Sequence, residues 1–317
     1  MKVFVTGGSG FVGGHVIEAL RAGHEVRAMA RSEASERAVE TLGAAAVRSS
    51  LDDVEAAHLA GCDAVVHAAA YVEDWGPEAA YERANVDGTR RLLAAAKAAG
   101  VRRFVHVSTN ATMFDGTAMR DVDESRPYPA RSPFPYARTK VAAERLVLEG
   151  NAPGFSTVAL RPCFVWGPRD NTVLPTLRRV VAQGGFAWMD GGRARISTTH
   201  VANLVAGIEL ALASLSSGAY FVADEEDTSV KEFFSGLATT ANLSLPNRSI
   251  PGIVARFAAN VLDVAWRALG RTTPPPITPL AAELSSRDMT VRTAKIRAEL
   301  GWRPVVGRAE GLAALRE

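Results

Sequence analysis

Short apolar runs alternate with amphipathic helical segments through the first half of the chain. The apolar runs predict strands at Lys2–Thr6, Glu25–Ala30, Ala44–Arg48, Ala64–His67, Arg103–Val107 and Ser156–Arg161. Apolar residues between them recur at helical spacing, and the longest predicted helices span Phe11–Ala22, Tyr81–Ala99 and Phe134–Glu149. Strands separated by helices form a parallel sheet covered on both faces, because such crossovers are right-handed. The pattern therefore predicts an α/β fold with a doubly wound parallel sheet.

The rhythm changes after Pro162. Prolines and glycine pairs interrupt the alternation, and the last hundred residues hold shorter elements with a proline-rich turn at Pro274–Pro276. We expect a larger domain over residues 1–165 and about 193–215. A smaller, discontinuous substrate domain is expected over residues 166–192 and 216–317.

Composition narrows the class of protein. The 317 residues are 47% hydrophobic and 22% charged, as in a globular protein. A formal net charge of +2 argues against a nucleic-acid binder, which needs a concentrated basic surface. The two cysteines, Cys62 and Cys163, build neither a disulfide framework nor a metal site, which favours a cytoplasmic location. No apolar stretch is long enough for a transmembrane helix.

A glycine motif lies between the first strand and the first helix. Gly7, Gly10 and Gly13 follow the pattern G-x-x-G-x-x-G, with Phe11 and Val12 opening the helix. The glycines permit a tight turn, close approach to a pyrophosphate and close packing of helix on strand. The helix N-terminus adds unpaired N–H groups and a positive dipole. The motif predicts a dinucleotide site, and the larger domain is therefore expected to be a Rossmann domain.

The end of the second strand bears on which dinucleotide is bound. An NAD site normally carries a carboxylate there for the ribose hydroxyls, but Ala30 stands in its place. Arg31 follows and pairs well with a 2′-phosphate, and Ser32 adds a hydroxyl. We expect NADP(H) to be favoured over NAD(H). The alternative is a surface arginine beside an NAD site that lacks the carboxylate.

A second chemical motif is Tyr136-x-x-x-Lys140. The i, i+4 spacing places the phenol and the ammonium on one helical face. An adjacent ammonium stabilises phenolate, so we expect Lys140 to lower the pKa of Tyr136. The pair is suited to proton transfer at a carbonyl or hydroxyl oxygen.

With these motifs, the whole chain resembles the extended, atypical short-chain dehydrogenase/reductases of the NAD-dependent epimerase/dehydratase superfamily. Further segments similar to that family are Val66–Ala70, Asn85–Thr89, Val107–Thr109, Leu160–Pro162, Val165–Pro168 and His200–Asn203. Other segments look like bacterial 3β-hydroxysteroid dehydrogenase-type proteins, namely Tyr71–Pro77, Ser197–Val201, Pro275–Thr278, Leu284–Asp288 and Glu299–Pro304.

The resemblance implies a catalytic set of Thr109, Tyr136 and Lys140. Together with the glycine motif and the second-strand argument, it gives the expected cofactor-binding residues: Gly7, Gly10, Phe11, Val12, Gly13, Arg31, Ser32, Leu51, Ala68, Ala70, Ser108, Tyr136, Lys140, Pro162 and Val165. No metal site is expected, because the histidines lack partners at ligand spacing. The resemblance also implies a homodimer through a four-helix contact that includes the Tyr136 helix.

The expected reaction is interconversion of a hydroxyl and a ketone on a bulky apolar small molecule, of the sterol or long-chain 3-oxo acid type. The candidate substrate-facing residues are apolar, namely Trp75, Met113, Phe114, Trp166 and Trp188. One alternative is a nucleotide-sugar epimerase or dehydratase with tightly bound NAD. The other is a non-catalytic cofactor-sensing regulator, against which the intact catalytic set argues.

Three features have open or plainer interpretations. The helix at Pro251–Leu269 has a polar stripe and an apolar face. It is interpreted as a core helix or a lid in preference to a membrane-contacting surface, because one Asp and two Arg make a poor basic face. His67 is expected to be a sheet-edge histidine satisfied by backbone groups. Asn85 either hydrogen-bonds on the cofactor side or ties its helix to a neighbouring loop.

Overall fold

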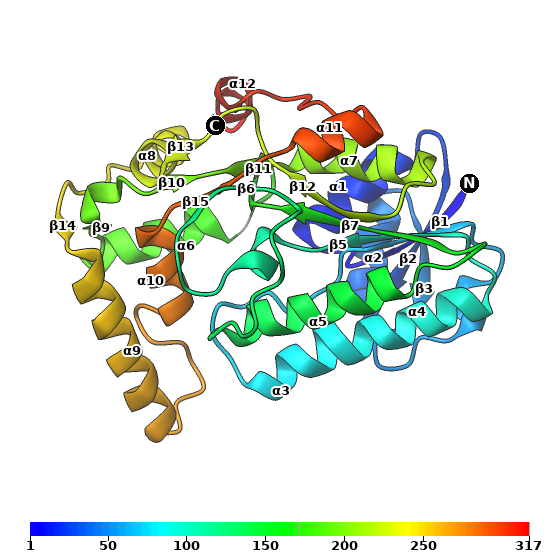
Figure 1. Cartoon of the computed structure of the whole chain (residues 1–317), viewed down its shortest axis with the longest axis horizontal. Helices are drawn as coiled ribbons and strands as arrows, with labels where there is room; N and C mark the ends of the chain where they lie inside the picture. The colour runs from blue at the N-terminus through cyan, green and yellow to red at the C-terminus, as the bar shows by residue number, and fades with distance from the viewer. Residues whose placement is uncertain (171, 317) are drawn as a thin grey trace.

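The computed structural model describes residues 1–170 and 172–316, and a sheet of seven parallel strands forms its larger part (Figure 1). The strand order is β12-β7-β5-β4-β1-β2-β3. These strands are β1 (Lys2–Thr6), β2 (Glu25–Ala30), β3 (Ala45–Arg48), β4 (Ala64–His67), β5 (Arg103–Val107), β7 (Ser156–Pro162) and β12 (Gly218–Val222). Every neighbouring pair is parallel, so the predicted doubly wound sheet is confirmed.

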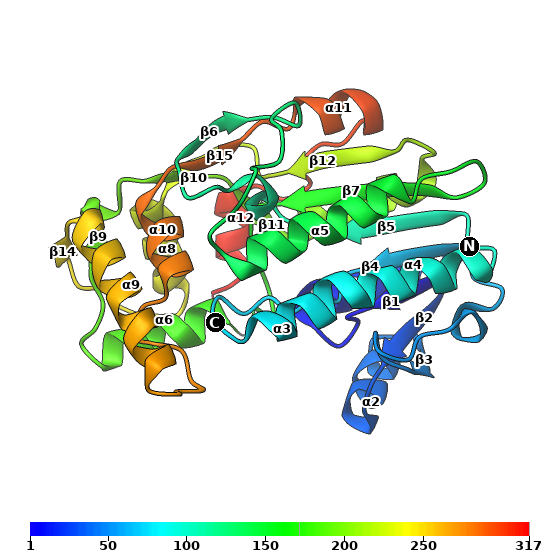
Figure 2. The same ribbon diagram turned by 60° about the horizontal axis from the view of Figure 1, so that its bottom comes forward.

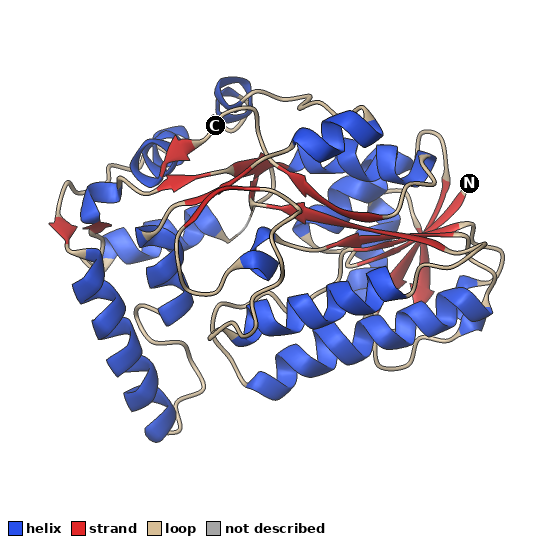
Figure 3. Cartoon of the chain, viewed as in Figure 1, coloured by secondary structure: helices blue, strands red, loops and turns tan. Residues whose placement is uncertain are grey.

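Helices cover both faces of this sheet (Figures 2 and 3). One face carries α1 (Phe11–Leu20), α2 (Glu33–Thr41), α7 (Val201–Ala213) and α11 (Ala294–Leu300), whose apolar residues share one core with the strands. The other face carries α4 (Gly88–Ala98) and α5 (Pro135–Glu149). The short helix α3 (Glu78–Tyr81) and a π-helical turn at Glu82–Asp87 lead into α4. Burial on both faces explains why the central strands are continuous apolar runs in the sequence.

The order of the sheet reverses between β1 and β4. These two strands are hydrogen-bonded neighbours, although β2 and β3 lie between them in the sequence. In open parallel sheets, ligands bind beyond the carboxyl ends of the strands at such a reversal. The loops after β1, β4 and β5 therefore meet where a ligand is expected.

The position of the seventh strand, β12, differs from the expected domain boundaries. Sequence analysis placed all of residues 216–317 in the smaller domain, but β12 pairs with β7 in the large sheet. Ile296, Leu300 and Trp302 also join the core of the large sheet.

The smaller part of the molecule is built from several segments that are separated in the sequence by segments of the larger part. Its main sheet has the order β13-β10-β15-β6, and two pairs, β8 with β11 and β9 with β14, complete it. The strands are β6 (Met119–Val122), β8 (Phe164–Trp166), β9 (Trp188–Met189), β10 (Arg195–Ile196), β11 (Thr198–His200), β13 (Thr228–Ser229), β14 (Ser249–Ile250) and β15 (Met289–Val291). The helices are α6 (Val173–Ala182), α8 (Val230–Thr240), α9 (Gly252–Ala268), α10 (Pro279–Ser286) and α12 (Arg308–Ala313).

A buried carboxylate ties the two parts together. Asp224, just after β12, accepts hydrogen bonds from Trp166 Nε1 at 2.8 Å and Thr198 Oγ1 at 2.7 Å. It also accepts from the His200 N–H at 2.7 Å and from Asn203 Nδ2 at 2.8 Å. Because a buried carboxylate needs such donors, it orders β8, β11 and the start of α7 around the end of the large sheet.

Helix α9 turns its polar face to the protein, whereas the core-helix interpretation predicts that its apolar face is buried. Its polar residues Arg256 and Asp263 face the protein, whereas Phe257, Val261 and Val264 are exposed. Small residues on the inner face, such as Ala259, allow α9 to approach α10 closely. The large apolar residues of α9 therefore do not belong to the core.

Candidate active site

The glycine turn after β1 is shaped for close backbone approach. Gly7 has φ +73°, and a Cβ there would lie 2.8 Å from the Ala69 nitrogen. A Cβ on Gly13 would lie 2.2 Å from the Gly7 oxygen, so only glycine allows α1 to begin against this turn. Gly10 donates its N–H to the Gly7 carbonyl at 2.9 Å and caps α1. The first turn of α1, with Phe11 and Val12, carries no acidic residue and leaves its N–H groups available to an anion.

The end of β2 presents a free cation. Arg31 is exposed, and among the described residues it has neither an ion pair nor a hydrogen bond. Ser32 is the N-cap of α2, and its hydroxyl accepts from the Ser35 N–H. Sequence reasoning missed Arg48, which lies opposite Ala30 on β3 and pairs with Glu36.

Six other expected cofactor-binding residues lie around the same sheet edge, and all of them except Ser108 have apolar side chains. Ala68 and Ala70 follow β4 and are half-buried, as are Leu51 after β3 and Val165 on β8, while Pro162 ends β7 and is buried. Ser108 is different, because its side chain is buried and its hydroxyl donates to Glu144. The Ser108 hydroxyl is therefore committed to the protein interior in this structure.

The three expected catalytic side chains come together at the start of α5. Thr109 follows β5, and its hydroxyl accepts from the Ala111 N–H at 3.2 Å. The Thr109 side chain lies close enough to Tyr136 to lower the pKa of that phenol. Lys140, one turn further along α5, donates from Nζ to the Val107 carbonyl at 2.9 Å. The end of β5 and the first two turns of α5 thus hold a hydroxyl, a phenol and an ammonium in one place.

The electrostatics of this cluster differ in one respect from the sequence prediction. Burial raises the pKa of Tyr136, and the nearby Thr109 side chain lowers it. The expected lowering by Lys140 is not among the causes that shift the pKa of Tyr136. Burial lowers the pKa of Lys140 from 10.5 to about 8, and the nearby Glu144 carboxylate raises it.

A buried ion pair behind Lys140 was missed by sequence reasoning. Glu144 is fully buried and accepts from Arg161 Nη2 at 2.6 Å and from Tyr128 Oη at 2.5 Å, in addition to Ser108. Arg161 lies on β7, so the pair joins α5 to the sheet. The available signal was that Glu144 continues the i, i+4 series of Tyr136 and Lys140 onto a buried helical face.

Two further polar residues organise the loop after β4. Asn85 accepts from the Tyr71 N–H at 2.7 Å and donates to the Tyr71 carbonyl and to Thr139 Oγ1. It ties its helix to a neighbouring loop, which is one of the two interpretations left open. His67 is satisfied by the hydroxyls of Thr6 and Thr89, not by backbone groups. Burial lowers the pKa of His67 to about 3, so its ring is neutral.

A cavity of about 400 Å³ lies beside Tyr136. It is lined by the loop Asp74–Gly76, the start of α5 and the inner face of α9. Its lining includes Glu78, Arg138, Asp263 and Arg267, which contradicts the expectation of a purely apolar pocket. These charges are paired within the protein: Arg138 with Glu78, and Arg267 with Asp263.

The expected substrate-facing residues are corrected by their burial. Met113, Phe114 and Trp166 have no exposed surface, and Trp188 is 4% exposed, so all four lie in the core of the smaller part. Trp166 additionally donates to Asp224, as described above. Trp75 is the one of the five that lines the cavity, where its indole donates to Asp263 Oδ1 at 2.6 Å. These side chains near strand ends pack in the core, and only their burial distinguishes them from side chains that line a pocket.

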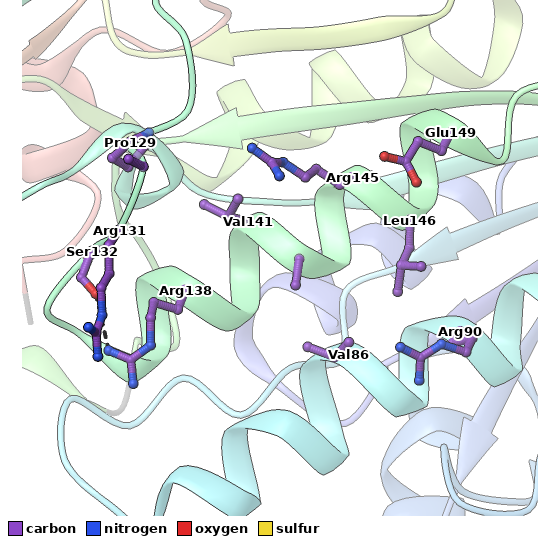
Figure 4. A pocket seen from close by; sticks show the side chains of 12 residues that line it. Val86, Arg90, Pro129, Arg131, Ser132, Arg138, Val141, Arg145, Leu146 and Glu149 are labelled. Carbon is purple, nitrogen blue, oxygen red and sulfur yellow. Dashed lines mark hydrogen bonds between the residues drawn. The ribbon is translucent and has the colours of Figure 1, made fainter.

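A second cavity, of about 420 Å³, lies on the outer side of α5 (Figure 4). It is lined by Val86, Val141 and Leu146, with Arg90 and Arg145 among its charged residues. None of the three catalytic side chains borders it. The predicted four-helix homodimer contact would cover this side of α5, and it stays a prediction.

The described residues, 1–170 and 172–316, also bear on metal binding and on membrane insertion. No group of three or more histidine, cysteine, aspartate and glutamate side chains is arranged to hold a metal ion. None of the helices in these ranges is long and apolar enough to cross a membrane.

The glycine turn and the Thr109–Tyr136–Lys140 cluster both lie within the part of the chain that matches a known protein family. The model of the NAD dependent epimerase/dehydratase family matches residues 3–223, which contain both features. The chain belongs to this family. It is an extended short-chain dehydrogenase/reductase, and several of its relatives are named as reductases or dehydrogenases.

Several curated relatives of this family cover nearly the whole chain. A 4-hydroxy-2-methyl-3-oxo-4-farnesyl-3,4-dihydroquinoline-1-oxide ketoreductase from Stigmatella aurantiaca is 41% identical, covering 100% of this chain and 96% of that protein. A 2-alkyl-3-oxoalkanoate reductase from Stenotrophomonas maltophilia is 32% identical, with coverages of 100% and 98%. A 3 beta-hydroxysteroid dehydrogenase/Delta 5-->4-isomerase from Mycobacterium tuberculosis is 33% identical, with coverages of 98% and 88%. The predicted likeness to 3β-hydroxysteroid dehydrogenases is confirmed.

Solved structures of the epimerase/dehydratase family share the fold. MoeE5 in complex with UDP-glucuronic acid and NAD has a TM-score of 0.75 and 26% identity, covering 99% of this chain and 97% of that one. The family and the relatives together identify the chain as an NAD(P)-dependent oxidoreductase.

The depressed pKa of Lys140 predicts how stability depends on pH. The pKa of Lys140 is about 8 in the folded protein and about 10.4 in an unfolded chain, so the unfolded state binds more protons between these values. The free energy of unfolding should therefore rise with pH from about 8 to about 10, by up to about 3 kcal/mol. Below pH 8 both states are protonated, and the contribution is constant.

Urea denaturation of the parent and of Lys140→Met across this pH range checks the prediction. The variant should lack the rise, because methionine does not titrate. Lys97→Met, which removes an exposed lysine, is the control and should keep it. Parallel pH dependence in the parent and in Lys140→Met would show that Lys140 titrates normally.

Proposed function

We propose that the protein is an NADP(H)-dependent reductase that interconverts a ketone and a hydroxyl on a bulky, largely apolar molecule. The observation that carries the proposal is the cluster of Thr109, Tyr136 and Lys140, with the ammonium tied to the Val107 carbonyl beside Thr109. A regulator without chemistry would have no need to bury an ammonium there, because an unpaired buried charge is costly.

The chain's own residues divide the chemistry of carbonyl reduction. A dinucleotide held at the glycine turn would supply the hydride for the carbonyl carbon. The Tyr136 hydroxyl donates a proton to the carbonyl oxygen, and burial, which raises its pKa, keeps it protonated and ready to act as the acid. The Thr109 hydroxyl donates a hydrogen bond to the same oxygen as negative charge develops. Lys140 provides a positive charge that steadies the phenolate left after proton transfer. In oxidation the same groups run in reverse.

The glycine turn fits a dinucleotide, and the end of β2 favours a 2′-phosphate. Gly7, Gly10 and Gly13 would hold the pyrophosphate against the start of α1, where side chains beyond glycine do not fit. Arg31, exposed and unpaired among the described residues, would bind the 2′-phosphate, with Ser32 beside it. Ala30 removes the carboxylate that would repel this phosphate.

The cavity supports an apolar substrate in spite of its charged lining. A nucleotide sugar carries a diphosphate that needs free cations, but Arg138 bonds to Glu78 and to two backbone carbonyls. Arg267 bonds to Asp263 and stacks over Trp75, 5.0 Å from the ring centroid. With both cavity arginines committed and Asp74 adding a further carboxylate, the described lining offers no free cation to a diphosphate. Relatives named for farnesyl-bearing, alkyl-chain and steroid substrates support the same class.

The cofactor preference is checked by Arg31→Ala. Losing a charged hydrogen bond to the 2′-phosphate should weaken NADPH binding by about 1.5–3 kcal/mol while leaving NADH binding nearly unchanged. Arg37→Ala, on the helix that follows Arg31 and already paired with Glu33, is the matched control and should change neither affinity. Calorimetric titration measures both cofactors. Equal affinity of the parent for NADPH and NADH would refute the preference.

The role of Tyr136 is checked by Tyr136→Phe. Turnover should fall by about 10²-fold or more because the acid is lost, while NADPH affinity stays close to that of the parent. Thr109→Ser keeps a hydroxyl and should keep most of the activity, whereas Thr109→Val should lose it. Parent-like ketone reduction by Tyr136→Phe would exclude Tyr136 as the proton donor.

The substrate class is checked with a panel at fixed NADPH concentration. Ketones and 3-oxo acids of increasing apolar size should show rising kcat/KM until the cavity is filled, because each buried Å² contributes about 25 cal/mol. A sterol or a long-chain 3-oxo compound should be a better substrate than any UDP- or dTDP-sugar. A flat response to apolar size, with turnover of a nucleotide sugar, would favour the epimerase or dehydratase alternative.

A further inference from the structure

The outer face of α9 carries a continuous apolar stripe. Ile253, Phe257, Val261 and Val264 recur at i, i+4, i+8 and i+11, and Val254 adds to the same side. All are exposed, Phe257 to 72% and Val261 to 52%. Of the large hydrophobic side chains exposed among the described residues, more than half belong to α9 and its C-cap Leu269. Scattered exposed apolar residues are normal, but a stripe along one helix indicates a contact surface.

The stripe is held in this orientation by the opposite face of the helix. Asp263 accepts from Trp75, Arg256 Nη1 donates to Ser286 Oγ at 2.7 Å, and the Gly252 N–H donates to Asp190 at 2.9 Å. Rotating α9 to bury the stripe would break all three contacts. The helix lies at the end of the molecule farthest from the N-terminus, with α10 on its inner side (Figures 1 and 2). The apolar face therefore points away from the body of the protein.

A second copy of the chain is a poor occupant for this stripe. The 17 residues of α9 make a helix about 25 Å long and about 10 Å wide, so its outer face offers about 250 Å². A stable dimer needs about 800 Å² from each partner. A lipid surface has no such threshold, because it binds an amphipathic helix lying in its interface by partial immersion.

Charge around the stripe favours an anionic lipid surface. Asp263 is the only acidic residue of α9, and it is turned inward onto Trp75 and Arg267. Arg248 precedes the helix and Arg271 follows it; both are exposed, and within the described chain neither has an ion pair. Unpaired arginines at both ends of an apolar stripe are attracted to the negative headgroups of a membrane.

We propose that α9 docks this protein on the surface of an anionic membrane, with its apolar stripe immersed among the lipids. The inner face of the same helix contributes Asn260, Asp263 and Arg267 to the cavity beside Tyr136. Docking therefore places that cavity on the inner side of α9, one helix diameter or about 10 Å from the lipid surface, where apolar substrates dissolve. The docking itself requires neither cofactor nor substrate.

Vesicle co-sedimentation of the full chain tests the proposal. The parent should pellet with vesicles of phosphatidylcholine and phosphatidylglycerol in equal amounts, and bind pure phosphatidylcholine more weakly. The double variant Phe257→Glu/Val261→Glu should lower partitioning by about tenfold or more, because two immersed apolar side chains become charged. Arg248→Gln/Arg271→Gln should reduce binding to the anionic vesicles and remove most of its salt dependence.

Leu215→Glu is the matched control. Leu215 is 87% exposed, follows α7 at the edge of the large sheet, and should leave partitioning unchanged when substituted. The proposal fails if the parent stays in the supernatant at every lipid concentration, or if Phe257→Glu/Val261→Glu pellets like the parent. It also fails if the double variant dissolves a dimer that the parent forms without lipid, since a second copy would then cover the stripe. Each measurement is independent of turnover, so the proposed reductase activity can fail while docking stands, and the reverse.

Discussion

A buried ammonium constrains the rest of this site. Lys140 is 2% exposed, and an ion in that position must be compensated nearby. Its direct partner is the Val107 carbonyl, and the next buried charge along α5 is Glu144, which is itself compensated by Arg161 on β7. The chain of contacts fixes α5 against β5 and β7. The position of Tyr136, one turn before Lys140, follows from that fixation.

The same constraint explains why polar residues recur behind the proposed catalytic residues Thr109, Tyr136 and Lys140. Ser108 and Tyr128 both donate to the Glu144 carboxylate, so the anion that balances Arg161 has few unused acceptor positions. Asn85 then joins the neighbouring helix to Thr139 and to the loop at Tyr71. A rigid polar layer of this kind limits the freedom of the phenol, which proton transfer requires.

Helix α9 has two unlike faces, one lining the cavity and one exposed on the outside of the protein. α9 gives its polar residues to the cavity wall and its apolar residues to the outside, which is the reverse of an ordinary surface helix. The paired charges of the cavity are neutral as a group, so they need not repel an apolar molecule. Their hydrogen bonds also keep the apolar stripe turned outward.

Local patterns were sufficient for six of the seven strands of the large sheet, the glycine turn and the spacing of Tyr136 and Lys140. Apolar runs, G-x-x-G-x-x-G and i, i+4 spacing depend on neighbouring residues, and each is recognisable within a short segment. β12 is as long as β1 and β5, but it lies beyond the interruptions that follow Pro162 and was therefore assigned to the smaller domain; its pairing with β7 is decided by tertiary structure. Met113, Phe114, Trp166 and Trp188 were assigned to the substrate because an aromatic side chain is identical in sequence whether it packs in a core or lines a pocket.

The pairing of charges was likewise decided only by tertiary structure. Glu144 and Arg161 are distant in the chain and meet across the helix–sheet interface, where the sheet excludes water. The amphipathic pattern of α9 established that the helix has two unlike faces, but not which one meets the protein. Hydrogen bonds to Trp75, Ser286 and Asp190 determine which face of α9 meets the protein. Leaving buried polar groups without hydrogen bonds costs more free energy than exposing methyl groups to water.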